Sequence, residues 1–347
     1  MNLKFLPWHK KIALDFLENL QNKFIHSWFI YGHEGIGKFH FALSISASIL
    51  CNSPNNLLAC EICQSCLLIK SGNHPDLKII LPDILSMDNL YNKDNYISYN
   101  SHYVNKKLSK EIRIEQIHNL KEWFYRFTYI NNKPKIVIIY PGKCLNTVSS
   151  NAILKILEDF NLKLIFLIVS EYTDDVIPTI LSRCSRLLLK SPSYDESKKW
   201  LIDNNINNID DHIYINGNSP LHIMLYGDDY KLYQDFLDII INALILGYIS
   251  ENKVFYLFDK LGTLECISIL QKLYFDLIQV SYGLKIQFFI KRYKEIIKIK
   301  NKYSINSFVY MWNLLYREKK IFSTHYLNNK LLIINILKNM KKLYFTD

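Results

Sequence analysis

The sequence predicts an α/β domain with a parallel sheet, followed by an all-helical C-terminal region. Strand-length apolar runs recur within the first 190 residues, and helix-patterned stretches separate them. A glycine-rich loop joins the first of these runs to a helix, and from about residue 230 onward the apolar spacing is helical. Because 347 residues exceed what one hydrophobic core usually organises, we expect more than one domain.

The strands are predicted from apolar runs of four to six residues. Strands that alternate with helices form parallel sheets, and burial on both faces makes each run almost continuously apolar. We expect strands at residues 27–31, 77–81, 135–140, 164–169 and 186–189. Between the second and third strands, residues 82–110 are rich in Asn, Tyr, Ser and Asp and predict a long surface loop.

Ser191-Pro192-Ser193 marks a break in the pattern and suggests a domain boundary. We therefore expect an α/β domain at 1–190 with a cysteine-rich module at 51–66, a small helical domain at 191–229, and a helical domain at 230–347. Within the last domain we expect amphipathic helices at 232–243, 264–280, 286–300 and 328–343.

The net charge of +10 comes from the C-terminal region, where residues 285–347 hold 14 Lys and Arg against 3 acids. Such a bias is typical either of a nucleic-acid surface or of the solvated faces of packed helices, and the apolar residues interleaved at helical spacing favour the second. We find no apolar run of membrane-spanning length and no secretory signal. We therefore expect a cytoplasmic protein without a membrane anchor.

The glycine loop has the spacing of a phosphate-binding loop, with Gly32, Gly35 and Gly37 followed by Lys38. In such a loop, backbone N–H groups hold phosphates at a helix N-terminus while the Lys reaches the terminal phosphates. The next position requires a Ser or Thr hydroxyl for Mg²⁺, and here it is Phe39. An aromatic ring cannot coordinate that metal.

A second requirement for ATP hydrolysis is also missing. An ATPase places a carboxylate at the end of the third strand, whereas this strand ends in Tyr140-Pro141. We predict that the chain does not hydrolyse ATP. Binding of ATP or ADP through Lys38 and backbone donors stays open, as does a purely structural role of the glycines in the strand-to-helix turn.

Four of the seven cysteines form a C-x8-C-x2-C-x2-C cluster made of Cys51, Cys60, Cys63 and Cys66. In a reducing compartment this spacing favours a metal over disulfides. Four thiolates suit a closed, tetrahedral, structural Zn²⁺ site. A redox pair at Cys60 and Cys63 would leave the other two cysteines unexplained.

These motifs, together with those downstream, make the chain similar to the AAA+ clamp-loader family. Over about two thirds of its length, the resemblance is carried by Pro7-Trp8, His26, the glycine loop, the cysteine cluster, His74-Pro75-Asp76, residues 151–159, Ser182-Arg183-Cys184 and Gly217-Asn218-Ser219-Pro220. The C-terminal third matches only in being helical.

Within that family the chain resembles the delta-prime class, which lacks an ATPase centre. The active gamma and tau motors keep the metal hydroxyl, a strand-end Asp-Glu and a lid Arg, where this sequence has Phe39, Tyr140-Pro141 and Leu221. The resemblance implies an AAA+ domain, a helical lid and a helical collar. It also implies that Arg183, flanked by Ser182 and Cys184, serves as a finger in a neighbour's ATP site.

The implied partners are gamma or tau and delta subunits in a hetero-pentamer that loads a sliding clamp on primer-template DNA. One departure is Lys38, which delta-prime subunits often lack. Two rival hypotheses are an active gamma/tau-type ATPase and a zinc-containing nucleic-acid-binding module. Steady-state ATP hydrolysis by the isolated chain would favour the first, and steeply salt-dependent DNA binding would favour the second.

Overall fold

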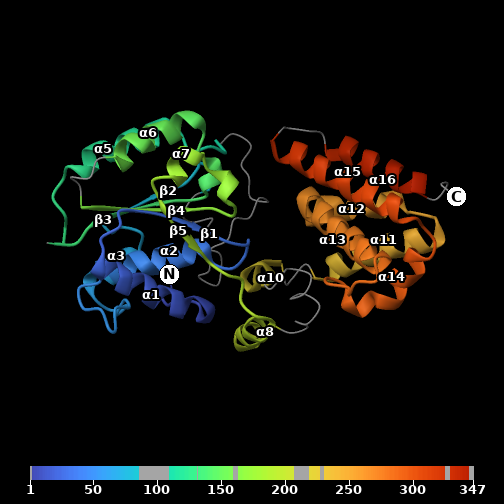
Figure 1. Ribbon diagram of the computed structural model, residues 1–347, viewed down its shortest axis with the longest axis horizontal. Coiled ribbons are helices and arrows are strands. Elements are labelled where there is room, and N and C mark those ends of the chain that lie inside the picture. The colour runs from blue at the N-terminus through green and yellow to red at the C-terminus, as the bar shows by residue number, and fades with distance from the viewer. Residues whose placement is uncertain are drawn as a thin grey trace. The chain divides into compact units, whose positions relative to one another are not determined.

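A computed structural model describes residues 2–85, 109–130, 132–158, 163–206, 219–226, 230–324 and 329–343 (Figure 1). The chain forms two compact units. The N-terminal unit contains Met1–Trp200 and Ser219–His222, and the C-terminal unit contains Leu201–Asn218 and Ile223–Asp347. The finer division into three domains stays a prediction, and most of the loop predicted at 82–110 lies outside the described residues.

The N-terminal unit is built on a five-stranded parallel sheet in the order β2-β3-β4-β1-β5. The strands are β1 (Ser27–Tyr31), β2 (Leu77–Ile80), β3 (Lys135–Ile139), β4 (Leu164–Val169) and β5 (Ser185–Leu188). All five lie where the apolar runs predicted them. The parallel α/β class and the helical C-terminal region are therefore confirmed.

Helices cover both faces of the sheet (Figure 1). Along β3, Ile136 and Ile138 pack into the core under α1, α2 and α3, whereas Val137 and Ile139 pack against α5, α6 and α7. This alternation follows from the two-residue period of a strand. The helices of this unit are α1 (Lys10–Asn22), α2 (Lys38–Leu50), α3 (Gln64–Lys70), α5 (Ile114–Phe124), α6 (Thr147–Leu157), α7 (Pro178–Leu181), the start of α8 (Tyr194–Asp203) and the start of α10 (Pro220–Tyr226).

Short 3₁₀ turns connect several of these elements, at Pro7–His9, Gly142–Cys144 and Thr173–Asp175. The first turn places Trp8 and His9 in the core beside α2. Thr173–Asp175 follows β4, at the edge of the sheet where the strands end. Loops at this edge of a parallel sheet are the usual place for a binding site.

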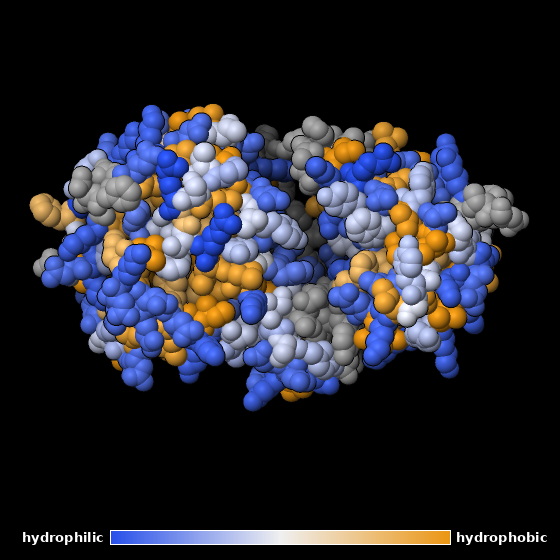
Figure 2. All heavy atoms as spheres, in the orientation of Figure 1, coloured by the Kyte–Doolittle hydropathy of each residue, from blue (hydrophilic) through white to orange (hydrophobic). Residues whose placement is uncertain are grey.

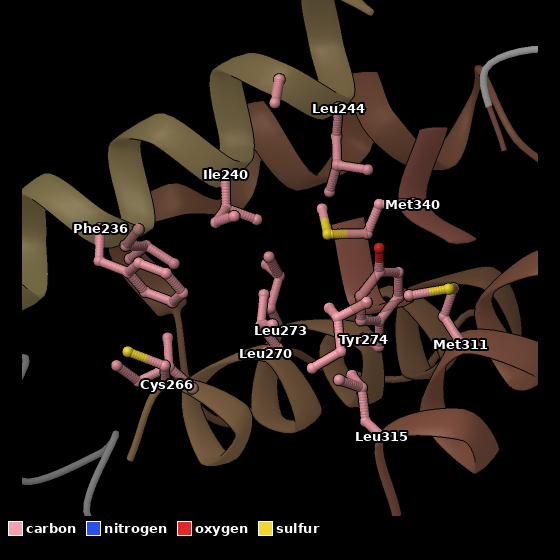
Figure 3. Packing of buried hydrophobic residues seen from close by; sticks show 14 of the residues in the cluster. Phe236, Ile240, Leu244, Cys266, Leu270, Leu273, Tyr274, Met311, Leu315 and Met340 are labelled. Atoms are coloured by element: carbon pink, nitrogen blue, oxygen red, sulfur yellow. The ribbon is translucent and has the colours of Figure 1, made fainter. Parts of the chain in front are cut away.

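The C-terminal unit is helical, with a core formed by α11, α12, α13, α14, α15 and α16 (Figure 1). Phe236, Leu270, Tyr274 and Met340 meet in the interior of this unit (Figure 3). These helices are α11 (Tyr230–Leu246), α12 (Glu251–Leu261), α13 (Thr263–Ser281), α14 (Tyr293–Lys300), α15 (Ile305–Thr324) and α16 (Asn329–Leu343), with a 3₁₀ turn at Ile290–Arg292.

The helix predicted at 286–300 is wrong in its first half. Helix α14 begins only at Tyr293, because the preceding backbone is bound by a buried carboxylate. Asp276 accepts hydrogen bonds from the N–H groups of Gln287, Phe288 and Phe289 at 2.8–3.0 Å. These donors are thereby satisfied outside a helix, which side-chain periodicity cannot reveal.

The viewed surface is mixed in polarity, with hydrophobic residues lying among hydrophilic ones on both units (Figure 2). None of the described helices is both long enough and apolar enough to cross a membrane.

Candidate functional site

The glycine loop lies between β1 and α2, as the sequence predicted. Gly35 and Gly37 adopt left-handed φ values of 73° and 90°, which glycine tolerates without steric cost. Gly37 caps α2, so that Lys38 begins the helix. The structure thus brings Gly32, Gly35, Gly37 and Lys38 together in a strand-loop-helix turn.

The carbonyls of the loop are hydrogen-bonded within the N-terminal unit itself. Four consecutive carbonyls, from residue 33 to residue 36, each accept a hydrogen bond. The four pairs are Lys38 Nζ to His33 O (2.7 Å), Ser219 Oγ to Glu34 O (2.6 Å), Leu221 N to Gly35 O (3.1 Å) and Trp8 Nε1 to Ile36 O (3.0 Å). Backbone and side chains of this unit therefore fix the loop.

Side chains also fill the space around the glycines. A Cβ atom on Gly35 would lie 2.8 Å from His222 Cβ and 2.9 Å from Ser219 Cβ. A Cβ on Gly37 would lie 2.4 Å from Leu6 Cδ1. Close approach of the chain to itself, as well as the positive φ, therefore requires glycine at both positions.

Lys38 is buried, with 6% of its surface exposed. Burial lowers the pKa of its ammonium group from 10.5 to about 8, although Glu171 and Glu34 act in the opposite direction. The fold therefore disfavours the charged form of Lys38. Its N–H donors point toward the loop, where one of them is used by the His33 carbonyl.

Aromatic rings occupy the two positions where an ATPase would hold Mg²⁺, and the two rings lie close together. The centroids of Phe39 and Tyr140 lie 5.0 Å apart, and Phe39 is buried. Two carboxylates that follow β4 were not predicted from the sequence. Glu171 pairs with Lys143 at 2.7 Å, and Asp175 accepts hydrogen bonds from Ser170 Oγ and two backbone N–H groups. Both acids are thus engaged within the unit.

Arg183 lies between the end of α7 and the start of β5, the strand that pairs with β1 on the side away from β4. Its side chain is partly exposed. Its guanidinium donates to one carboxylate oxygen of Glu158, with Nη2 at 2.7 Å and Nε at 3.0 Å, and to the carbonyl of Thr179. The backbone carbonyl of Arg183 accepts from Ser27 Oγ at 2.5 Å. The side chain is therefore held within its own unit, although residue pattern alone gave Glu158 no role.

The residues on either side of Arg183 have structural contacts. Ser182 Oγ donates to the carbonyl of Thr179, which completes the turn after α7. Burial raises the pKa of Cys184 to about 11, so this thiol is not reactive as a thiolate at neutral pH.

The four predicted metal ligands meet in space. The sulfurs of Cys51, Cys60, Cys63 and Cys66 all lie within 4.8 Å of one another, and this cluster could hold a metal ion. The Cys51–Cys63 Sγ distance is 3.8 Å, which is about the edge of a tetrahedron with bonds of roughly 2.3 Å to Zn²⁺. Backbone N–H groups of residues 60, 63 and 66 lie 3.3–3.5 Å from cysteine sulfurs and favour negative charge there.

His74-Pro75-Asp76 connects the cysteine module to the sheet. His74 Nε2 lies 2.9 Å from Ser65 Oγ on α3, and its Nδ1 accepts from the N–H of Asp76. The Asp76 carboxylate accepts the N–H groups of Tyr129 and Ile130. This motif, which the sequence singled out without a role, therefore orders the loop that enters β3.

Comparisons with known proteins indicate the family of the chain. The family model described as "DNA polymerase III, delta subunit" matches residues 9–193. Three relatives are called DNA polymerase III subunit delta'. The relative from Pseudomonas aeruginosa is 27% identical over 62% of this chain and 59% of its own length. The relative from Buchnera aphidicola subsp. Baizongia pistaciae is 27% identical over 71% of this chain and 68% of its own length. The relative from Buchnera aphidicola subsp. Schizaphis graminum is 25% identical over 85% of this chain and 87% of its own length. The match to the Pseudomonas relative therefore spans less than two thirds of that protein.

Proposed function

Because the chain belongs to the DNA polymerase III delta subunit family, we propose that it is a delta-prime subunit of a bacterial clamp loader that does not hydrolyse ATP. Its proposed partners are gamma or tau motors and a delta subunit in a hetero-pentamer. This assembly would load a sliding clamp on primer-template DNA. The observation that carries the proposal is the closed phosphate loop, with aromatic rings in place of both metal ligands.

Hydrolysis requires Mg²⁺ and a positioned water, and this loop has a group for neither. Phe39 has no oxygen atom in its side chain, Tyr140 has no carboxylate, and the nearby Glu171 is paired with Lys143. An active gamma/tau-type ATPase would have to break that ion pair and move both rings. The non-hydrolysing function is therefore the better supported of the two.

We further propose that the α/β domain is an AAA+ module, that residues 191–229 are its lid, and that residues 230–347 are a collar that packs with other subunits. Exposed apolar side chains on α15 and α16 support the collar role, among them Tyr316, Leu331 and Ile334.

Arg183 is the proposed finger for a neighbouring ATP site. A guanidinium offers forked donors to the transferring γ-phosphate, and such fingers contribute on the order of 10³ to 10⁵ in rate. In the free chain the guanidinium pairs with Glu158. Both side chains are partly exposed, so this pair is worth only about 0.2–1 kcal/mol, and a triphosphate of higher charge can compete for the arginine.

Zinc is the proposed occupant of the cysteine cluster. Four sulfur ligands with no open position favour a structural Zn²⁺ over a catalytic one. The metal would join the end of α2 to α3, and through Ser65 and His74 it would support the loop that enters β3.

The test is a reconstitution with gamma and delta subunits from the same organism. The chain should copurify with them, and by itself it should show no ATPase activity. Arg183→Ala should leave assembly intact and slow DNA-stimulated ATP hydrolysis and clamp loading by the pentamer. Failure to copurify would contradict the clamp-loader assignment, whereas normal hydrolysis at every motor site would remove only the finger role.

A further inference from the structure

Cys51 differs from the other three cysteines of the cluster in how the chain delivers it. Cys60, Cys63 and Cys66 follow one another at short spacing, so local turns bring their sulfurs together. Cys51 comes eight residues before Cys60 and directly after the end of α2. The last carbonyls of a helix have no partner within the helix. Contacts from outside α2 therefore decide where the Cys51 sulfur lies.

Three consecutive carbonyls at the end of α2 each accept a hydrogen bond from a side chain. Lys133 Nζ donates to the carbonyls of Ile49 and Cys51 at 2.7 and 2.9 Å. Ser65 Oγ, on α3, donates to the carbonyl of Leu50 at 2.8 Å. The ammonium group also complements the negative end of the helix dipole. Lys133 thus joins the loop before β3 to the backbone of one metal ligand.

The backbone around Lys133 is itself ordered. Its N–H donates to the carbonyl of Ile130 at 3.2 Å, and Asn132 has a left-handed φ of 66°, which asparagine adopts more readily than most residues. Pro134 follows and restricts Lys133 to an extended backbone. The side chain is half-buried. Lys133 is therefore held in place from its own loop as well as from α2.

The charge of Lys133 lies within electrostatic reach of the cluster. Burial lowers the pKa of its ammonium group, and thiolates at Cys51 and Cys63 act in the opposite direction. No carboxylate in the described part of the chain is among the charges that act on it. Four thiolates around one Zn²⁺ leave a net negative charge, and Cys51 and Cys66 are fully buried. A buried charge of this kind is costly unless an opposite charge lies near it.

Lys70, a second lysine of the cysteine module, has a different role. Its Nζ donates to the backbone carbonyl of Glu61 at 3.0 Å and to the Glu61 carboxylate at 3.2 Å. Glu61 lies between Cys60 and Cys63 and has a left-handed φ of 66°. Lys70 therefore holds this turn, while its charge is offset by Glu61.

We propose that Lys133 is a positioning residue for the metal of the cysteine cluster, because its hydrogen bonds place Cys51 and its ammonium group offsets part of the negative charge of the thiolates. This role rests on the proposed zinc site, but it does not depend on the phosphate loop or on the clamp-loader assignment. Loss of groups that support metal ligands in this way typically weakens metal binding by about 10–100-fold. A lysine that only capped α2 would not affect the metal.

The Zn²⁺ affinity of the full-length chain, measured by competition with a chelator of known affinity, tests this role. Lys133→Met keeps the apolar length of the side chain and should weaken Zn²⁺ binding at least about tenfold. Lys133→Gln keeps an amide donor for the α2 carbonyls but no charge, and should weaken binding by a similar factor. The matched control Lys163→Met, which removes an exposed lysine just before β4, should change the affinity less than about twofold. Circular dichroism shows that each variant is folded.

Replacing Zn²⁺ by Co²⁺ gives a readout that helix capping alone would not move. Loss of a nearby positive charge raises the energy of the sulfur electrons, so the sulfur-to-cobalt charge-transfer band of Lys133→Met should move to longer wavelength. Lys133→Arg keeps the charge and should keep the band in place. Equal Zn²⁺ affinities of Lys133→Met and Lys163→Met, or an unmoved band in Lys133→Met, would overturn the role of Lys133. A wild-type chain that binds no Zn²⁺ would instead remove the zinc site itself.

Discussion

Replacing Lys38 by Met should change how stability depends on pH. The pKa of Lys38 falls from 10.5 in the unfolded chain to about 8 in the fold, so the unfolded chain holds more protons between these values. Stability contributed by this group is therefore complete above pH 10.5 and is lost as the pH falls through about 8. At pH 7 the buried charge costs about 3 kcal/mol, and about 1 kcal/mol of this is recovered by pH 9.

The Met variant removes that charge but leaves the His33 carbonyl without its donor, which costs about 1–3 kcal/mol. At pH 7 the two effects nearly offset each other. The distinguishing result is the slope: between pH 7 and 9 the wild type should gain about 1 kcal/mol relative to Lys38→Met. Urea unfolding, followed by tryptophan fluorescence at several pH values, measures it.

Lys10→Met is the matched control, since Lys10 is exposed at the start of α1. Its pH dependence should match that of the wild type. If Lys38→Met also follows the wild type, then Lys38 is hydrated and the loop is open, and the reasoning about a closed loop is refuted.

Three further predictions concern the other sites. Restoring metal ligands with Phe39→Ser, Tyr140→Asp and Pro141→Glu together should not create ATPase activity above that of the wild type, because the loop remains closed; turnover in a coupled assay would contradict this. Purified protein should contain about one Zn²⁺ per chain, and Cys66→Ser should lose most of it and lower the melting temperature; wild-type protein with free thiols and less than about 0.2 Zn²⁺ would rule out the site. Glu158→Gln should release the proposed finger and raise DNA-stimulated hydrolysis by the reconstituted pentamer by no more than about fivefold, because an exposed ion pair is worth at most about 1 kcal/mol; a fall in hydrolysis would instead mean that Glu158 positions Arg183 for catalysis.

The central strands β3, β4 and β1 were predictable because they are buried on both faces. Ile136 and Ile138 face one layer of helices and Val137 and Ile139 the other, so the whole strand is apolar and is distinct from its surroundings. The cysteine cluster was predictable for a different reason. Short, fixed spacing between Cys60, Cys63 and Cys66 limits the geometry before any tertiary contact is considered.

The contacts that hold the glycine loop could not be predicted, since the bonding partners are distant in the sequence. Ser219 bonds to a carbonyl 185 residues earlier, and Trp8 to one 28 residues later. Both residues belong to motifs that the sequence singled out, but a motif gives no bonding partner. The start of α14 was misjudged for the same reason, because Asp276 lies on α13 and the backbone that it binds lies in the segment between α13 and α14.

Loss of the metal ligands and closure of the loop have a common physical basis. A phosphate that entered this loop would bind backbone N–H groups and the Lys38 ammonium, so the bond that it would replace is that of Lys38 to the His33 carbonyl, worth about 0.5–1.5 kcal/mol. Every 1.4 kcal/mol is tenfold in affinity, so replacing that bond would weaken binding by about 2-fold to 10-fold. Without Mg²⁺ the phosphate charge would face one lysine that the fold already prefers to be neutral. Where no metal can be held, the side chains that fill the space around the glycines stabilise the fold and no longer obstruct any chemistry. Lys38 can therefore remain as a hydrogen-bond donor to its own loop.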